Sequence, residues 1–229
     1  MNDRRDADAE ARRRMLEAIR AEAAATARWT GRSAFSEAVM AALAEVPRHR
    51  FVPEHLRAHA YDNAPLPIGG GQTISQPYIV ALMTDLLDLA PGARVLEVGT
   101  GSGYQAAVLS RIAGEVYSVE TLPDLARAAQ ARLAELGYAN VFMKVGDGYH
   151  GWPEHAPYDA VMVTAAVPAV PEPLLAQLRP GGRMVLPVDV AAGQELILLE
   201  KAEDGGVRRR DILPVAFVPL TGSHGRERA

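Results

Sequence analysis

A glycine-rich segment offers the first candidate for ligand binding. Residues 93–103 read Ala-Arg-Val-Leu-Glu-Val-Gly-Thr-Gly-Ser-Gly, so the short apolar run at 95–98 leads directly into three glycines. Such a run, bounded by glycines, is typical of a parallel strand that is buried on both faces. Glycines at a strand-to-helix turn adopt positive φ and leave room for a ligand beside the backbone, because they have no Cβ. The segment predicts a nucleotide-type site.

Acidic residues end the next two predicted strands. Residues 115–120 end at Glu120, whose carboxylate could accept hydrogen bonds from a ribose diol. Residues 141–145 lead into a Gly-Asp-Gly turn centred on Asp147, which could lie beside an adenine amino group. Taken alone, Glu120 is a solvated strand end and Asp147 an ordinary turn residue. Together with the glycines they mark the carboxyl ends of successive strands, where open α/β sheets bind ligands.

The spacing of the glycines separates two ligand classes. A dinucleotide fingerprint reads G-x-G-x-x-G, whereas Gly99, Gly101 and Gly103 are spaced G-x-G-x-G. The loop, Glu120 and Asp147 together resemble the S-adenosylmethionine site of class I methyltransferases. A nucleotide-binding module without catalysis, such as a dinucleotide sensor, stays open as an alternative of another class.

Composition limits the remaining possibilities. The 229 residues, 48% hydrophobic and 23% charged, suffice for one α/β domain with a sizeable core. No apolar run approaches roughly eighteen residues and the charged N-terminus has no apolar signal core, so we expect a cytoplasmic protein without membrane contact. The absence of cysteine excludes disulfides, thiolate metal sites and a cysteine nucleophile. A net charge of -4 argues against a nucleic-acid binder, and we expect a monomer.

The chain divides into a charged N-terminal segment and one larger domain. Residues 1–30 are rich in Ala, Arg and Glu and predict a charged helical extension on the surface, whereas 31–229 form a single domain. A second helix is predicted over 36–46, with Ser36 as its N-cap. Residues 63–77 have the composition of a loop, and long loops inside compact domains are commonly functional. Pro77 then begins a helix that runs to residue 89.

The C-terminal half predicts the rest of a doubly wound sheet. Residues 158–164 form a strand, and a crossover helix containing Leu174 stops at the Pro-Gly-Gly of 180–182. The strand 183–188 follows, and 194–200 and 208–220 close the sheet as a hairpin. The fold class is therefore α/β, a mainly parallel, Rossmann-like sheet of seven strands with an antiparallel end. The order of the last two strands is left open.

Three segments closely resemble the bacterial protein-L-isoaspartate O-methyltransferase family. They are 71–78 (Gly-Gln-Thr-Ile-Ser-Gln-Pro-Tyr), 95–105 and 146–148. The Thr-Ile-Ser sequence is the discriminating part, because the glycine loop is common to many methyltransferases. The similarity runs from about Ala34 to Thr221, and the stretch before residue 30 is longer than the usual start of the family.

The resemblance implies a set of site residues. The residues expected to bind S-adenosyl-L-methionine, or its product S-adenosyl-L-homocysteine, are Thr73, Ile74, Glu97, Gly99, Thr100, Gly101, Ser102, Gly103, Glu120, Thr121, Asp147 and Gly148. Those expected to bind the substrate are Ser75, Thr164, Ala165, Val218 and Thr221. Ser75 is the catalytic candidate, which orients the acceptor carboxylate; its plainer role is a helix cap. No recognisable His or Asp arrangement accompanies it, so a serine nucleophile is not expected.

The residue types favour an anionic acceptor. A carboxylate, with a solution pKa of about 4, is ionised at neutral pH and needs no general base. The sequence after the strand 158–164 is Thr-Ala-Ala-Val-Pro, which lacks the Asn-Pro-Pro-Tyr type of motif of amino-group methyltransferases. His55 and His59 lie four residues apart without a third ligand nearby, and no metal site is expected.

The expected function is protein repair. The resemblance implies methylation of the free α-carboxylate of L-isoaspartyl residues in damaged proteins and peptides, with D-aspartyl residues as a second candidate acceptor. The ester then cyclises to a succinimide that reopens in part to aspartate. Within enzymes, the alternative is a related carboxyl methyltransferase that acts on a dedicated peptide through its longer N-terminus.

Overall fold

A sheet of seven strands, in the order β5-β4-β3-β6-β7-β8-β9, organises the protein. The structure, a computed structural model, describes residues 2–222. The strands are β3 (Arg94–Val98), β4 (Glu115–Glu120), β5 (Val141–Val145), β6 (Tyr158–Val163), β7 (Leu178–Val190), β8 (Gly193–Lys201) and β9 (Val207–Val215). The first five pair in parallel and the last two antiparallel, which confirms the predicted fold class. β8 lies between β7 and β9, which settles the order that the sequence left open.

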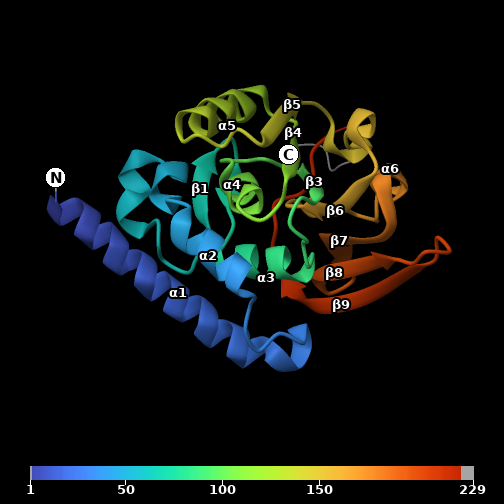
Figure 1. The fold of residues 1–229 in the computed structure, drawn as a ribbon, viewed down its shortest axis with the longest axis horizontal. Coiled ribbons are helices and arrows are strands. Elements are labelled where there is room, and N and C mark those ends of the chain that lie inside the picture. Colours follow the sequence, from blue (N-terminus) through green and yellow to red (C-terminus); the bar gives the residue numbers. More distant parts are fainter. Residues whose placement is uncertain (1, 223–229) are drawn as a thin grey trace.

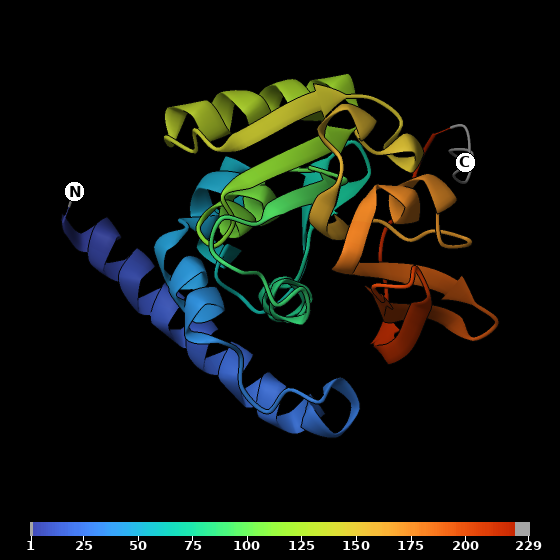
Figure 2. The ribbon, with the colours of Figure 1, turned by 45° about the vertical axis from the view of Figure 1, so that its right-hand side comes forward.

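Helices cover both faces of this sheet (Figures 1 and 2). They are α1 (Asn2–Thr30), α2 (Glu37–Glu45), α3 (Pro77–Leu86), α4 (Tyr104–Ser110), α5 (Pro123–Glu135) and α6 (Glu172–Gln177), with the short 3-10 turns η1 (Arg48–Phe51), η2 (Glu54–His59), η3 (Gly148–His150) and η4 (Pro153–His155). Successive strand residues point to opposite faces. Accordingly Val95 packs in the core beneath α1 to α4, and Leu96 packs in the core beneath α6.

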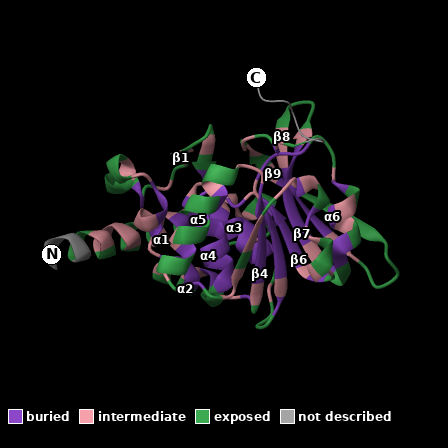
Figure 3. Ribbon diagram, turned by 90° about the horizontal axis from the view of Figure 1, so that it is seen from above, coloured by how far each residue is buried: buried purple, intermediate pink, exposed green. Residues whose placement is uncertain are grey.

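The helix α1 belongs partly to the core. Met15, Ile19 and Ala23 recur every four residues and are 1%, 0% and 0% exposed. This stripe packs with α2 and α3 in the larger core cluster, and α1 also contacts β9 (Figures 1 and 3). The expectation of a surface helix is therefore wrong for this face, because three small or medium apolar residues suffice to bury it. A domain boundary at residue 30 stays a prediction.

The predicted loop 63–77 contains a short hairpin. Its strands β1 (Leu66–Gly69) and β2 (Gln72–Ile74) pair antiparallel. Gly70 and Gly71 form the turn with φ of +60° and +73°, values that L side chains rarely adopt. The strands were missed because four and three residues are too few to show an alternating pattern. Pro77 begins α3 as predicted.

The boundary between α6 and β7 also differs from the prediction. The helix ends at Gln177 and β7 begins at Leu178, so the Pro-Gly-Gly sequence that was expected to stop the helix lies within the strand, at a shift in its register with β6. A Cβ on Gly182 would lie 2.9 Å from the carbonyl oxygen of Asp159, so glycine here permits a close approach of β6 and β7. Within residues 2–222, no helix is both long and apolar enough to cross a bilayer.

Candidate functional site

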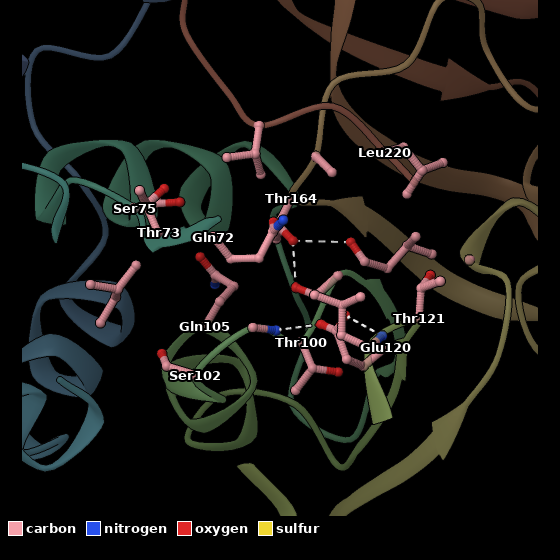
Figure 4. Close-up of a pocket in the computed structure, with 18 of the residues that line it drawn as sticks. Gln72, Thr73, Ser75, Thr100, Ser102, Gln105, Glu120, Thr121, Thr164 and Leu220 are labelled. Carbon is pink, nitrogen blue, oxygen red and sulfur yellow. Dashed lines mark hydrogen bonds between the residues drawn. The ribbon is translucent and has the colours of Figure 1, made fainter. Parts of the chain in front are cut away.

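A pocket opens at the carboxyl ends of β3, β4 and β6, with about 710 Å³ of empty space in and around it. Its lining combines the backbone of the glycine loop with hydroxyl groups and the Glu120 carboxylate, which are groups that can hydrogen-bond a nucleotide. Figure 4 shows Thr73 and Ser75 on one side of it and Glu120 and Thr121 on the other. The predicted site residues that line it are Thr73, Ile74, Ser75, Gly99, Thr100, Gly101, Ser102, Glu120, Thr121, Gly148, Thr164, Ala165, Val218 and Thr221.

The glycine loop is fastened to the end of β6 by Thr164. Its hydroxyl donates to the carbonyl oxygens of Val98, at 3.0 Å, and Gly99, at 2.5 Å. Gly99 has a φ of +96°, and a Cβ there would collide with the Thr164 hydroxyl oxygen. Glycine is therefore required at 99 for both the backbone conformation and the close approach. The loop presents its backbone to the pocket in a fixed shape.

Glu120 holds the same loop from β4. Its carboxylate accepts hydrogen bonds from the backbone N–H groups of Gly101, at 2.8 Å, and Leu122, at 3.0 Å. The residue is only 7% exposed. A carboxylate has about four lone-pair sites, so the side chain retains acceptor capacity toward the pocket. It can accept hydroxyl groups of a ligand while it fixes the loop.

Glu97 lies behind the loop and does not line the pocket. The Ser118 hydroxyl hydrogen-bonds the Glu97 carboxyl group and is 2.5 Å from the hydroxyl of Thr100, which does line the pocket. Burial raises the pKa of Glu97 to about 8, and the nearby charge of Glu120 acts in the same direction. Glu97 is therefore largely protonated at neutral pH. It supports the loop through Ser118 without adding a full negative charge.

Gly103 and Asp147 are likewise absent from the lining. Gly103 precedes α4 with a φ of +86°, and a Cβ there would lie 3.2 Å from Leu133 of α5, so the glycine serves helix packing. The Asp147 carboxylate caps η3 by accepting from the Tyr149 N–H at 3.0 Å. It also lies against the backbone of Gly222. Its role toward adenine stays a prediction.

Ser75 stands where the pocket meets a second cavity, which we name the outer groove. The outer groove is lined by Glu22, Thr26, Trp29, Pro65, Thr73, Ser75, Gln76, Tyr78, Ile79, Thr164 and residues 213–218. The N-cap of α3 is Gln76, so Ser75 is not the helix cap. Within residues 2–222, no carboxylate or imidazole hydrogen-bonds the Ser75 hydroxyl. That side chain is therefore available to a ligand.

Several lining residues were not predicted: Gln72, Val80, Val98, Tyr104, Gln105, Val119, Leu122, Pro219 and Leu220. Gln72 directly precedes Thr73, and Leu122 follows Thr121, so their positions in the chain were a usable signal. Gln105 lines the pocket, and its side-chain amide donates to Thr84 of α3 at 2.9 Å. That contact joins two helices, and no local pattern indicates it.

Neither of the paired histidines is part of the site. They lie in the 3-10 turn η2, and the His59 ring is 2.9 Å from the Asp62 carboxylate. Among the residues that the structure describes, no group of three His, Asp or Glu side chains could hold a metal ion.

Comparison with known proteins gives a consistent result. A family model described as Protein-L-isoaspartate(D-aspartate) O-methyltransferase (PCMT) matches residues 26–225. Protein-L-isoaspartate O-methyltransferase 2 of Nitrosococcus oceani is 56% identical over 212 residues, which cover 93% of this chain and 97% of the relative. Protein-L-isoaspartate O-methyltransferase 1 of Cupriavidus necator is 59% identical over 220 residues, covering 96% and 85%.

Solved structures agree with the sequence comparison. A protein-L-isoaspartate O-methyltransferase superimposes with a TM-score of 0.76 at 31% identity, covering 93% of this chain and 67% of the other. A putative protein-L-isoaspartate O-methyltransferase from Plasmodium falciparum, in complex with S-adenosyl-L-homocysteine, gives a TM-score of 0.74 at 22% identity. It covers 90% of this chain and 96% of its own, and this second likeness concerns the fold alone.

Proposed function

The chain belongs to the protein-L-isoaspartate(D-aspartate) O-methyltransferase family, and we propose that it methylates the free α-carboxylate of L-isoaspartyl residues in damaged proteins, using S-adenosyl-L-methionine. The observation that carries this assignment is the position of Ser75. Its side chain lines both the cofactor pocket and the outer groove that an acceptor can enter, and within residues 2–222 no carboxylate or imidazole hydrogen-bonds its hydroxyl. D-Aspartyl residues are a second candidate acceptor.

The residues of the pocket fit the cofactor. S-Adenosyl-L-methionine supplies a methyl group activated on a sulfonium. Glu120 has acceptor capacity for the ribose hydroxyls, and the backbone at Gly99 and Gly101 is open to close approach. We assign the other predicted cofactor contacts to residues on the same walls: Thr73, Ile74, Thr100, Ser102, Thr121 and Gly148. Glu97 and Gly103 do not line the pocket, so we assign them an indirect role, in which they support the glycine loop that lines it.

The chain's own residues position the acceptor and need not activate it. An isoaspartyl carboxylate is ionised at neutral pH, so no general base is required. The Ser75 hydroxyl donates a hydrogen bond to that carboxylate, while the Thr164 hydroxyl is already committed to the carbonyl oxygens of the loop. Ala165 adds no charge that would repel an anion. Alignment and exclusion of water then provide most of the rate enhancement.

The decisive experiment uses matched peptides. The protein is incubated with cofactor labelled in the methyl group and with two peptides that differ only in an isoaspartyl or an aspartyl residue. We expect label only in the isoaspartyl peptide, as a base-labile ester, and a succinimide on further incubation. Equal labelling of both peptides, or of neither, refutes the substrate assignment.

Calorimetry separates this proposal from a module that only binds nucleotides. S-Adenosyl-L-homocysteine is expected to bind in preference to NAD, because the glycines are spaced G-x-G-x-G. A preference for NAD, together with no methylation of either peptide, favours the non-catalytic alternative.

Deleting residues before 30 cannot separate general repair from a dedicated peptide substrate. Such a truncation exposes the core around Met15 and Ile19. It also removes Glu22, which accepts from the Gln76 side chain next to Ser75. Loss of activity would then report loss of structure. Point substitutions in α1 are the appropriate test.

Location and assembly remain part of the proposal. We propose a monomer that acts in the cytoplasm on isoaspartyl proteins and peptides, without nucleic-acid or membrane partners. Its net charge of -4 supports the exclusion of nucleic acid. Sedimentation equilibrium at two concentrations measures the assembly state, and a mass above one chain contradicts the monomer.

A further inference from the structure

The outer groove is open and largely apolar. It has about 1460 Å³ of empty space in and around it, and its apolar lining includes Ile79, Leu213, Val215 and Phe217. It shares Thr73, Ser75, Thr164 and Val218 with the cofactor pocket. The two cavities therefore adjoin at the residue proposed to hold the acceptor.

One wall of this groove is the C-terminal half of α1. Glu22, Thr26 and Trp29 line it, and their spacing of four and three places them on one face of the helix. This face adjoins the stripe of Met15, Ile19 and Ala23 that anchors α1 in the core. The N-terminal helix thus reaches the site that acts on the acceptor.

Hydrogen bonds fix that wall to the residues around Ser75. The Glu22 carboxylate accepts from the Asn63 amide at 2.6 Å and from the Gln76 amide at 3.1 Å. The hydroxyls of Thr26 and Tyr78 are 2.6 Å apart. Tyr78 in turn donates its backbone N–H to Asn63 at 3.0 Å. The wall is therefore rigid relative to the acceptor position.

Trp29 is the large exposed side chain of this wall. It is 52% exposed, although its ring lies 3.8 Å from the Arg28 guanidinium carbon. The other large exposed apolar residues, Phe142, Val145, Val190 and Val207, do not line the outer groove. A tryptophan presented at the rim of an apolar groove offers contact area at a small cost in side-chain entropy, as is typical of residues that dominate binding energy.

We propose that Trp29 contacts an apolar side chain flanking the isoaspartyl residue, so that α1 sets a sequence preference of the enzyme. This rests on the proposed function. An isoaspartyl residue within a protein has chain on both sides, and a chain whose acceptor lies at Ser75 can extend along the outer groove, because Ser75 lines that groove as well as the pocket. The apolar lining favours apolar neighbours. The Glu22 carboxylate disfavours acidic ones.

The test compares three isoaspartyl peptides of equal length, with leucine, glycine or aspartate flanking the acceptor. The wild type is expected to show the lowest KM for the leucine peptide and the highest for the aspartate peptide. Trp29→Ala should raise the KM for the leucine peptide about tenfold and leave its kcat unchanged. The KM for the glycine peptide and the affinity for S-adenosyl-L-homocysteine should stay within about twofold of wild type, and Trp29→Phe should restore most of the preference.

Val207→Ala is the matched control, because it removes an exposed apolar side chain away from the groove. It should change none of these constants. The proposal is overturned if Trp29→Ala changes the KM for the leucine and glycine peptides equally, or if it leaves the KM for the leucine peptide unchanged.

A binding measurement keeps this result separate from the proposed function. In a Trp152→Phe background, Trp29 is the only tryptophan of the chain. In the presence of S-adenosyl-L-homocysteine, binding of the leucine peptide should change the fluorescence of Trp29, whereas the glycine peptide should leave it unchanged. A wild type that binds the leucine peptide at Trp29 but methylates none of the three refutes the proposed function and leaves the groove assignment standing. A titration with no fluorescence change overturns the groove assignment.

Discussion

The Arg48 side chain donates a hydrogen bond of 2.8 Å from Nη2 to the carbonyl oxygen of Ser75. Arg48 is 0% exposed, and its Nε donates to the carbonyl oxygen of Ala60 at 2.8 Å. Its guanidinium carbon lies 4.8 Å from the centre of the Tyr104 ring. Burial lowers the pKa of this guanidinium, and the ring and carbonyl groups offset the cost of the buried charge. Arg48 therefore positions the backbone of the proposed acceptor site.

Replacing Arg48 should affect stability and turnover together. Arg48→Lys keeps the charge but cannot reproduce the fork that reaches two carbonyl groups, so we expect a loss of about 1 to 3 kcal/mol in the free energy of unfolding. kcat should fall several-fold, because Ser75 loses its support, while the affinity for S-adenosyl-L-homocysteine stays close to wild type. Urea unfolding, steady-state kinetics and calorimetry measure the three effects.

Arg50→Lys provides the control for this substitution. Arg50 makes an exposed ion pair with Glu135, and such pairs contribute about 1 kcal/mol or less. Its unfolding free energy and kcat should therefore change little. A wild-type kcat in stable Arg48→Lys would show that the bond to Ser75 has no part in catalysis.

Glu120 should be essential for cofactor affinity. We expect Glu120→Ala to weaken binding of S-adenosyl-L-homocysteine by roughly ten- to a hundredfold, from charge-assisted hydrogen bonds worth about 1.5 to 3 kcal/mol. The carboxylate also holds the N–H groups of Gly101 and Leu122, so part of the loss will come from a looser glycine loop. Glu120→Gln retains one acceptor oxygen and should lose less. Calorimetry on both variants measures this, and unchanged affinities would return Glu120 to a purely structural role.

Elements with a clear local pattern were predictable. The runs at 95–98, 115–120 and 141–145 are rich in apolar residues and each adjoins a glycine at one end, and each forms part or all of a strand of the sheet. Glu120 could be placed as well, because it ends a parallel strand and ligands of open α/β sheets bind outside the carboxyl ends of the strands.

Residues whose role depends on distant contacts were not predictable. Asp147 also follows a strand, but its carboxylate turns to cap η3 and does not line the pocket. Gln105 of α4 is held by Thr84 of α3, 21 positions away in the chain, and Arg48 binds Ser75 across 27 positions. The burial of Met15 and Ile19 depends on packing against α2 and α3, which form this contact only in the folded chain.

The ionisation of Glu97 should lower stability as the pH rises. Its pKa is raised from 4.5 to about 8 in the folded protein, so the unfolded chain releases its proton first. The stability that this group contributes is fully present below about pH 4.5 and is lost as the pH rises toward about 8, at up to about 1.4 kcal/mol per pH unit. Glu97→Gln replaces the titratable carboxyl group with a neutral amide, whose oxygen can still accept a hydrogen bond from Ser118. The difference in unfolding free energy, variant minus wild type, should therefore grow between about pH 5 and pH 8 in urea titrations.

A flat difference across that range would mean that Glu97 stays ionised in the folded protein.

Ser75 should act by orientation and not as a nucleophile. If it donates one hydrogen bond to the carboxylate in the transition state, Ser75→Ala should lower kcat/KM roughly ten- to a hundredfold, the equivalent of about 1.5 to 3 kcal/mol. Binding of S-adenosyl-L-homocysteine should be affected much less. A covalent role predicts near-complete loss and a modified enzyme, so a methyl- or peptidyl-Ser75 found by mass spectrometry during turnover would contradict orientation.

The β1–β2 hairpin should close over the bound ligand. Ile68 of β1 lies over the glycine loop, since a Cβ on Gly101 would be 3.3 Å from its Cδ1 atom. Gly69, Gly70 and Gly71, all with positive φ, form an exposed turn that can hinge. A ligand in the pocket would add contacts to Gln72, Thr73 and Ile74, so addition of S-adenosyl-L-homocysteine should slow proteolysis at the hairpin.

The turn between β8 and β9 is an internal control for this closure. It contains the exposed residues Asp204, Gly205 and Gly206 and does not line the pocket. Limited proteolysis with a protease of broad specificity, read by mass spectrometry, gives both cleavage rates in one sample. We expect the ligand to lower the rate at 66–74 and leave the rate at 204–206 unchanged. Equal protection at both turns would indicate a global gain in stability, and no protection at 66–74 would argue against a lid.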